Sequence, residues 1–175
     1  MTKKPESFRG KAWVLTDSEG EPINDIDTDM IYHNAHLAET EVEKMGRYAL
    51  GNLEGWEDFP QKVSAGDIVI AAKNFGCGSS RQHAVECFRA LGVSCLVVES
   101  AGAIYRRNAI NSGFPLLVAP GITKSGIETG DVIVVDIAKG VVNCPDKEIQ
   151  FSAEPFSDVQ MEIYRAGSLF DVKPG

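Results

Sequence analysis

Apolar positions along the chain change their spacing from one segment to the next, and this predicts alternating strands and helices. The middle of the chain carries short β-branched and apolar runs, typical of buried strands, separated by segments with apolar residues at helical spacing. Strands are predicted at Asp67–Ala72, Ser94–Glu99 and Phe114–Ala119, and helices at Arg81–Leu91 and Ala101–Asn111. This order favours parallel strands with helices lying on the sheet.

The two ends of the chain have a different pattern. A strand is predicted at Lys11–Leu15 and a helix at Thr40–Leu50, with Val42, Met45 and Ala49 on one face. The last third predicts short antiparallel strands at Asp131–Ile137, Val141–Asn143 and Glu148–Phe151, then a helix at Phe156–Phe170 with Val159, Ile163 and Leu169 in the core. The sum is one α/β domain over residues 1–175 that contains more than one sheet.

The composition narrows the class of partner and the compartment. A net charge of −8 disfavours nucleic acid and anionic membranes. No apolar run approaches the roughly 20 residues of a membrane span, and the N-terminus lacks the apolar core of a secretory signal. Four cysteines without C-x-x-C spacing indicate reduced thiols, so we expect a cytoplasmic protein.

Residues 74–84 (NFGCGSSRQHA) form a glycine-rich turn that runs into a predicted helix. A turn that ends in serines at a helix start leaves backbone N–H groups without partners. These groups, the helix dipole and Arg81 together favour an anion. The spacing matches neither a dinucleotide fingerprint nor a phosphate loop. On spacing alone, Ser79 or Ser80 could simply cap the helix.

A second polar segment holds three carboxylates within five residues, Asp25, Asp27 and Asp29. Such a cluster could bind a hard cation, or its members could form Asx turns and cap a helix. His33 and His36 follow in the same loop but complete no zinc pattern. No metal site is therefore predicted in this chain.

Three segments, in this order, resemble the swivel domain of the aconitase superfamily. Residues 74–84 are similar to its N-F/Y-G-x-G-S-S-R-E-H-A stretch, and Cys at x is typical of the separate small subunits of isopropylmalate isomerases. Residues 25–31 (DIDTDMI) resemble its D-I/V-D/N-T-D-x-I segment, and residues 103–115 (AIYRRNAINSGFP) its I-Y/F-x-x-N-x-x-N-x-G segment. The ending EIYRAGSLFDV is similar to the usual E-I-x-x-A-G-G-L.

The resemblance implies a fold and a partner. The fold is the swivelling β/β/α domain, an α/β architecture with mixed sheets and flanking helices. In this family a large subunit holds a 4Fe-4S cluster through three cysteines, its iron acts as a Lewis acid, and the small subunit closes over it. This chain has no cysteine triplet with cluster spacing. We therefore expect a heteromer whose cluster belongs to the large subunit.

The resemblance also implies roles for individual residues. Ser79, the first serine of S-S-R, is expected to act as an alkoxide base that takes a C–H proton from the substrate. Ser80 and Arg81 are expected to hold a substrate carboxylate, Arg81 through a bidentate fork. Asp29 is expected to face the catalytic histidine of the large subunit and set its charge. Backbone N–H groups beside Arg81 would stabilise the Ser79 anion.

The chain departs from the family pattern at two places. Gln82 replaces the usual glutamate, which removes a charge near Arg81. In relatives that act on citrate or homocitrate-type acids, an arginine in the loop after the aspartates pairs with the extra carboxylate. Here the matching position is Ala38, which has no charge, and Glu39 beside it would repel a carboxylate. The third substituent of the substrate is therefore expected to be apolar, such as isopropyl.

These expectations describe the small subunit of a hydro-lyase that isomerises isopropylmalate by dehydration and rehydration in leucine biosynthesis. Two alternatives remain open. The same chemistry could act on another 2-hydroxy dicarboxylate of the citramalate, dimethylmalate or homoaconitate type. The chain could also be an anion-binding module without catalytic activity.

Overall fold

The strands form a seven-stranded sheet with the order β4-β3-β2-β1-β5-β6-β7 in the computed structural model, which describes residues 3–175. The strands are β1 Ser7–Val14, β2 Ile68–Ala71, β3 Cys95–Val98, β4 Leu116–Val118, β5 Val132–Asp136, β6 Val141–Cys144 and β7 Ile149–Ser152. The α-helices are α1 Thr28–Ile31, α2 Val42–Met45, α3 Phe59–Lys62, α4 His83–Ala90, α5 Ala103–Asn111 and α6 Asp158–Ala166.

Strand β1 joins a parallel half of the sheet to an antiparallel half. Its residues 12–14 pair in parallel with β2, while residues 7–11 pair antiparallel with β5. Strands β2, β3 and β4 continue the parallel half, and β5, β6 and β7 form the antiparallel half. The expectation of more than one sheet is therefore wrong, because the eight residues of β1 are enough to pair with both halves.

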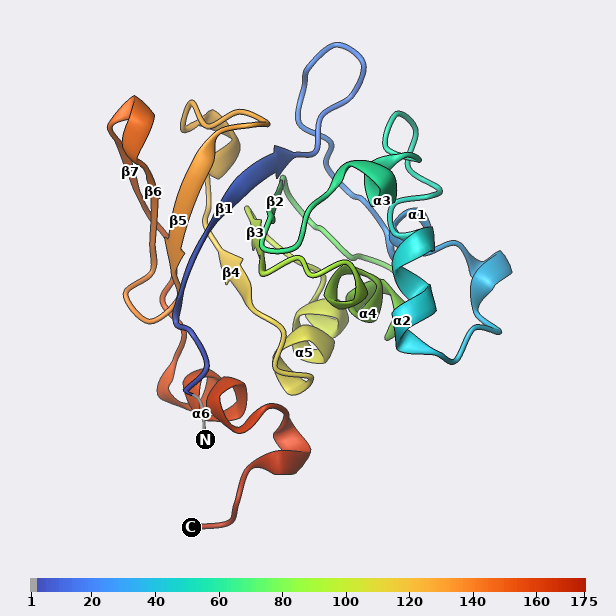
Figure 1. The fold of residues 1–175 in the computed structure, drawn as a ribbon, viewed down its shortest axis with the longest axis vertical. Helices are drawn as coiled ribbons and strands as arrows, with labels where there is room; N and C mark the ends of the chain where they lie inside the picture. Colours follow the sequence, from blue (N-terminus) through green and yellow to red (C-terminus); the bar gives the residue numbers. More distant parts are fainter. Residues whose placement is uncertain (1–2) are drawn as a thin grey trace.

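The parallel half of the sheet is covered on both faces. On β2, Val69 and Ala71 face the cluster under α2, α4 and α5, while Ile68 and Ile70 face the cluster under the antiparallel strands and α6. This alternation follows from the two-residue period of a strand. Figure 1 shows α4 and α5 on one side of the parallel strands, with β5, β6 and β7 curving away on the other side. The result is the β/β/α layering that was expected.

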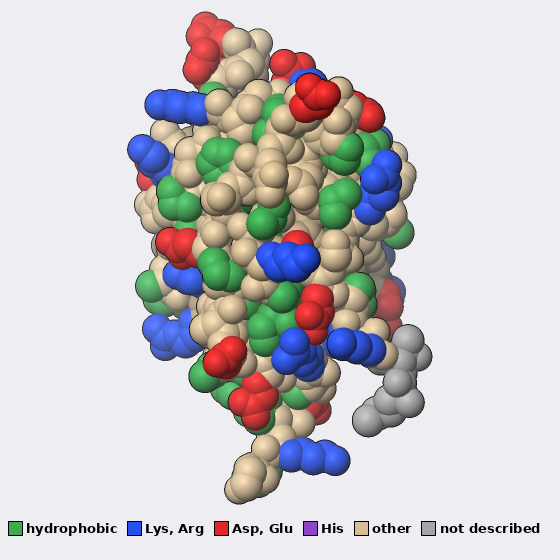
Figure 2. Space-filling view, turned by 90° about the vertical axis from the view of Figure 1, so that its left-hand side faces the viewer, with side chains coloured by type: hydrophobic (Ala, Val, Ile, Leu, Met, Phe, Trp, Pro, Cys, Tyr) green, Lys and Arg blue, Asp and Glu red, His purple; other side chains and the backbone are tan. Residues whose placement is uncertain are grey.

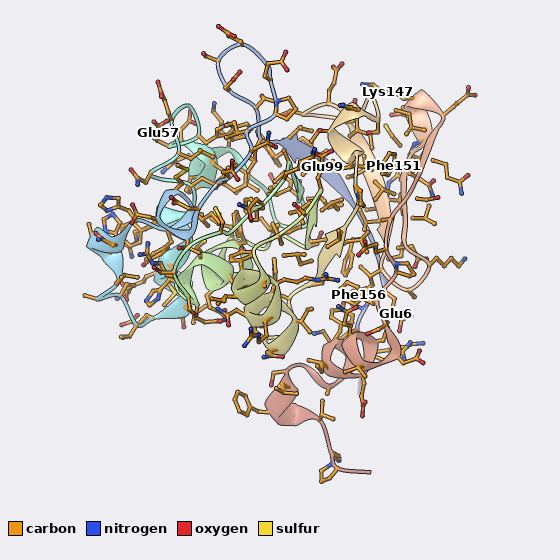
Figure 3. All side chains as sticks on the ribbon, turned by 180° about the vertical axis from the view of Figure 1, so that it is seen from behind. Glu6, Glu57, Glu99, Lys147, Phe151 and Phe156 are labelled. Carbon is orange, nitrogen blue, oxygen red and sulfur yellow. The ribbon has the colours of Figure 1, made fainter. Side chains whose placement is uncertain are left out.

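The second core cluster closes the antiparallel half. Phe151 on β7 and Phe156 before α6 pack against it. In Figure 3 both labelled rings lie on the side of β6, β7 and α6, whereas Glu57 lies near α3 at the opposite end of the molecule. The start of β1 lies near α6 (Figure 1), where Arg165 on α6 donates to the carboxylate of Glu6.

Two predicted helices differ from the observed ones. The helix expected at residues 40–50 shortens to α2 and a 3-10 turn, and its Gly46 packs so closely against α4 that a Cβ would lie 3.1 Å from Leu91. Helix α6 is shorter than expected at both ends. It starts after the Ser157 cap, whose side chain and that of Gln160 form a capping box, and stops before Gly167, which has a φ of 109°.

Only one of the three core contacts expected for residues 156–170 is observed. Ile163 is buried, as expected, but the residues Val159 and Leu169 are 64% and 44% exposed, so those two assignments are wrong. Leu169 lies beyond the end of α6, in a separate 3-10 turn.

Among residues 3–175, no helix is both long enough and apolar enough to cross a membrane. The surface carries charges of both signs. Figure 2 shows the face near β6 and β7, where basic and acidic side chains are interspersed instead of gathered into a patch of one sign.

Candidate active site

Three loops meet at the carboxyl ends of β1, β2 and β3, where parallel sheets commonly bind ligands. The loop after β2 forms isolated bridges with the loop after β1, between Cys77 and Asp27, and with the loop after β3, between Phe75 and Ala101. The Gly76 N–H also donates to the carbonyl of Ile26 at 2.7 Å. The three segments that carry the family motifs therefore come together in space.

Glycine is required at two points of this junction. Gly76 has a φ of +75°, and a Cβ there would lie 2.2 Å from Cγ of the buried Tyr105 on α5. At Gly102, just before α5, a Cβ would lie 2.9 Å from the carbonyl oxygen of Gly76. The close approach of these backbones fixes the position of the turn that follows.

The turn itself leaves a row of backbone N–H groups without hydrogen-bond partners among the described residues. Helix α4 starts at His83, two residues later than expected, and its N-cap is Gln82, which makes no capping hydrogen bond through its side chain. The alternative in which Ser79 or Ser80 caps the helix is therefore wrong. No N–H from Gly78 through Gln82 donates a hydrogen bond to another group of residues 3–175.

Both serines of the turn lie at the surface. Ser79 is exposed, and its carbonyl oxygen accepts a hydrogen bond from the hydroxyl of the buried Thr28 at 3.0 Å. Ser80 is also exposed, and its hydroxyl oxygen accepts a hydrogen bond from the side-chain amide of Asn108 on α5 at 3.2 Å. The hydroxyl of Ser79 thus lies where a partner protein or a ligand could reach it.

Arg81 links the serine turn to the loop after β1. Its Nη1 atom donates to Oδ1 of Asp29 at 3.0 Å and to the carbonyl of Tyr32 at 2.8 Å. The side chain of Arg81 is only 13% exposed, although that of Asp29 is 42% exposed. Neither Nε nor Nη2 of Arg81 has a hydrogen-bond partner among residues 3–175, so this edge of the guanidinium can receive a carboxylate side-on.

Asp29 is held by three neighbours. Its Oδ1 atom accepts from the backbone N–H of Asn34 at 2.9 Å as well as from Arg81, and its Oδ2 atom accepts from the side-chain amide of Asn52 at 3.1 Å. The Asn34 N–H and then Arg81 hold the pKa of Asp29 below its ordinary value. Asp29 is therefore an anion at neutral pH, and it orients Arg81.

Ala38 lies on an exposed loop that is tied to the start of α4. The carbonyl of the next residue, Glu39, is 2.9 Å from Nε2 of His83, the first residue of α4. The carboxylate of Glu39 accepts a hydrogen bond from the N–H of Glu41 at 3.0 Å. The loop that was expected to select the substrate is thus anchored near the serine turn.

The acidic segment has structural partners. Asp27 caps α1 by accepting from the N–H of Met30, and Asp25 accepts from the side-chain amide of Asn74 at 2.9 Å. Asp27 therefore follows the capping alternative, and Asp25 bonds to the turn after β2. Within residues 3–175, no group of three His, Cys, Asp or Glu side chains is arranged to hold a metal.

The four cysteines are free thiols, and three of them are buried: Cys87, Cys95 and Cys144. Cys77 lies in the turn, but burial, and then the nearby Asp27 and Asp25, raise the pKa of its thiol. A raised pKa keeps this thiol protonated at neutral pH, so it is poorly suited to act as a nucleophile.

Two polar side chains near the motifs do not join the site. The Nη2 atom of Arg106 on α5 lies 3.9 Å from Glu154, which follows β7. Gln82 uses its amide to donate to Glu86 on its own helix at 2.9 Å, and no hydrogen bond links it to Arg81. Arg81 is therefore the cation that hydrogen bonds hold beside the serine turn.

Sequence reasoning missed three residues that contact the expected ones: Thr28, Asn52 and Asn108. Thr28 and Asn108 lie within two of the motifs, so their presence there was a usable signal. Asn52 lies in a loop of no recognisable pattern, and only the fold brings it to Asp29.

This fold and site define a class of protein. Residues 24–120 match the aconitase C-terminal domain family. The 3-isopropylmalate dehydratase small subunit 1 of Methanopyrus kandleri is 39% identical, over 94% of this chain and 91% of its own length. The isopropylmalate/citramalate isomerase small subunit of Methanocaldococcus jannaschii is 37% identical, over 93% of this chain and 90% of its own length.

A solved structure agrees. The crystal structure of 3-isopropylmalate dehydratase from Methanocaldococcus jannaschii superposes with a TM-score of 0.83 at 30% identity, covering 95% of this chain and 92% of that one. The chain therefore belongs to the aconitase C-terminal domain family, and within it to the small subunits of 3-isopropylmalate dehydratases. The resemblance seen in the motifs and the expected fold are both confirmed.

Proposed function

We propose that this chain is the small subunit of a hydro-lyase that interconverts 2-isopropylmalate and 3-isopropylmalate by removing and re-adding water, a step of leucine biosynthesis. The observation that carries the proposal is the exposed Ser79 in a turn of unpaired N–H groups, two residues before Arg81. The relationship to 3-isopropylmalate dehydratase small subunits over 94% of the chain supports it. The whole chain acts as one swivel domain, and its free thiols fit the reducing cytoplasm.

In the dehydration direction, the oxygen of Ser79 takes a proton from a substrate carbon and a C=C bond forms, while the hydroxyl group leaves as water with a proton from the charged histidine of the large subunit. In the rehydration direction, Ser79 returns the proton to carbon. A free serine hydroxyl is too weak an acid to supply this base at neutral pH. The N–H groups of residues 78–82 and the positive charge of Arg81 stabilise the alkoxide and so lower the pKa of the Ser79 hydroxyl.

Binding of the substrate uses the neighbouring groups. Arg81 presents Nε and Nη2 to a substrate carboxylate, while its Nη1 stays bonded to Asp29 and Tyr32. Ser80 donates its hydroxyl proton to the same carboxylate, because its oxygen already accepts from Asn108. Asp29, which is 42% exposed on its side chain, faces the partner's catalytic histidine and favours its charged form.

The chain does not work alone. Ser79 and Ser80 are at the surface, and a proton abstraction from carbon needs a site from which water is excluded. We assign the covering surface to a large subunit. The 4Fe-4S cluster expected for this family belongs to that subunit too, because the cysteines other than Cys77 are buried and the chain has no cysteine triplet with cluster spacing.

Ala38 directs the choice of substrate. It offers no charge to a third carboxylate, and the carboxylate of Glu39 follows it, so a substrate with an apolar third substituent is favoured. Citramalate has a smaller apolar substituent and is the second candidate, because the relative from Methanocaldococcus jannaschii is named for both isopropylmalate and citramalate.

Reconstitution tests the function. The chain is mixed with the iron-loaded large subunit of the same organism, and the formation of the alkene from 3-isopropylmalate is followed by ultraviolet absorbance. We expect activity only when both subunits are present. Activity with neither 3-isopropylmalate nor citramalate, despite formation of the complex, would favour the anion-binding module without catalysis.

The substrate class is tested separately with Ala38→Arg. We expect kcat/KM for 3-isopropylmalate to fall by about tenfold. We also expect a gain in activity on an acid with a third carboxylate, such as homoaconitate. Ala35→Arg, in the same exposed loop, is the matched control and should leave the ratio of the two substrates unchanged. If Ala38→Arg and Ala35→Arg show the same ratio of activities on the two substrates, Ala38 does not contribute to the choice of substrate.

A further inference from the structure

We propose that Thr28 is a positioning residue: it orients the peptide between Ser79 and Ser80 so that the N–H of this peptide points at the negatively charged oxygen of the Ser79 side chain. This inference rests on the proposed function. Thr28 is one of only three buried polar or charged residues among residues 3–175, with 3% of its surface exposed. Its hydroxyl donates to the carbonyl oxygen of Ser79 at 3.0 Å, across 51 positions of the sequence. The hydrogen bond of this buried hydroxyl to a backbone carbonyl of the catalytic turn indicates a role in the geometry of the turn.

A second contact strengthens the link between the two segments. The backbone N–H of Thr28 donates to the carbonyl oxygen of Cys77 at 3.0 Å. One residue therefore holds two carbonyls of the turn, those of residues 77 and 79, on the side of the turn that faces the protein interior. Gly78 between them has a φ of +98°, a conformation that few other residues adopt at low cost.

The orientation of the N–H groups follows from the planar trans peptide. In such a unit the C=O and the N–H point in opposite directions. Because Thr28 draws the carbonyls of Cys77 and Ser79 inward, the N–H groups of Gly78 and Ser80 point outward, where neither donates to any group of residues 3–175. Their outward direction is also the side on which Ser79 and Ser80 are exposed.

Two peptides of the turn are therefore held by different parts of Thr28. The peptide between residues 77 and 78 is held by the backbone of Thr28, and substitution of the side chain leaves that hydrogen bond in place. The peptide between residues 79 and 80 is held by the hydroxyl of Thr28. Loss of the hydroxyl frees this peptide to rotate, so that its N–H no longer stabilises negative charge on the Ser79 oxygen.

Thr28→Val, Thr28→Ser and Thr28→Cys test the inference in the reconstituted enzyme with 3-isopropylmalate. Valine keeps the shape of threonine without the donor, serine keeps the donor, and cysteine supplies a weak one. For Thr28→Val we expect kcat to fall about 10- to 100-fold, because one donor to the developing anion is misaligned rather than removed. We expect KM to change by less than about threefold. Thr28→Ser should restore kcat, and Thr28→Cys should lie between the two.

The split between kcat and KM, and the rescue by serine, separate positioning from a purely structural role. If Thr28→Val keeps the wild-type kcat, the inference is wrong. It is also wrong if, in all three variants, kcat and the melting temperature fall and KM rises together, without rescue by serine. Should Thr28→Val not fold, Thr28→Cys, which is similar in size, decides the same question. Ser79→Ala is measured in parallel: if it retains the wild-type rate, the proposed function itself fails, independently of Thr28.

Discussion

The parallel and antiparallel halves of the sheet use their polar groups in different ways. In the antiparallel half, Lys147 bonds to Asp131 at 2.7 Å, and the Ser157 and Gln160 side chains satisfy the start of α6. In the parallel half, the turn after β2 keeps five consecutive N–H groups, residues 78–82, unpaired within residues 3–175. Unsatisfied donors at an exposed turn are ready to bind an anion, whereas satisfied ones only stabilise the fold.

The connections explain why the halves differ. Antiparallel neighbours need only short turns, such as residues 137–140 between β5 and β6 and residues 145–148 between β6 and β7. Parallel neighbours need crossover connections, and the connections after β1, β2 and β3 all start at the carboxyl ends of these strands. The comparison predicts that substitutions in the parallel half change catalysis and those in the antiparallel half change stability alone.

The largest expected effect belongs to Ser79→Ala. Removal of the proposed base should lower kcat of the reconstituted enzyme by about 10²- to 10⁴-fold, because proton transfer from carbon then lacks its acceptor. Binding of the large subunit, measured by analytical ultracentrifugation, should not change. Ser152→Ala, an exposed serine on β7, is the control and should keep the wild-type rate. Comparable rates for the two variants would contradict the assignment of the base.

Gly76→Ala comes next. A Cβ here meets Tyr105 at 2.2 Å and forces alanine into a φ of +75°, so the free energy of unfolding should fall by about 2–5 kcal/mol. Urea denaturation measures this change. Gly130→Ala, before β5, also has a positive φ but open space, and it isolates the cost of the backbone conformation. Equal losses for the two variants would mean that contact with Tyr105 is unimportant.

Arg81→Lys should have an intermediate effect. Lysine cannot bond to Asp29 and also receive a carboxylate side-on, so KM for 3-isopropylmalate should rise about 10- to 100-fold. Steady-state kinetics measure it. Arg165→Lys is the matched control. Arg165 lies on α6 and pairs with Glu6 at 2.8 Å, and its substitution should leave KM unchanged. A normal KM for Arg81→Lys would show that the substrate does not use the guanidinium fork.

The smallest expected effect is that of Ser157→Ala in the antiparallel half. Loss of the capping box should lower the free energy of unfolding by about 1 kcal/mol, with kcat and KM unchanged. Urea denaturation and kinetics on the same preparation test both statements. A change in kcat here would break the distinction between the two halves.

Much of the fold could be predicted from local patterns. The strands at residues 68–71 and 95–98 and helix α5 lie where apolar spacing placed them. The helix at residues 40–50 could not be predicted correctly: it ends at Met45 and continues as a 3-10 turn, in which Gly46 packs against Leu91. Val159 and Leu169 had helical spacing too, but Val159 lies on the exposed face of α6 and Leu169 lies beyond the end of that helix.

The candidate site, like the fold, could be predicted only in part from the sequence. The glycine turn, its serines and Arg81 were visible as a motif because they are contiguous. The side-chain contacts that complete it span much longer separations: Thr28 to Ser79, Asn52 to Asp29, and Asn108 to Ser80. No local period can reveal such pairs, because each depends on how the crossovers bring distant loops together.

By itself, then, the sequence determined the order of strands and helices, the glycines of the turn and membership in the family, since these depend on neighbouring residues and on short contiguous motifs. Only the tertiary structure decided that β1 unites both halves in one sheet, that Asp29 and not a ligand occupies Nη1 of Arg81, and that Thr28 reaches the carbonyl of Ser79. The physical reason is that hydrogen bonds across a junction of loops form between groups tens of residues apart, and the fold alone sets their geometry.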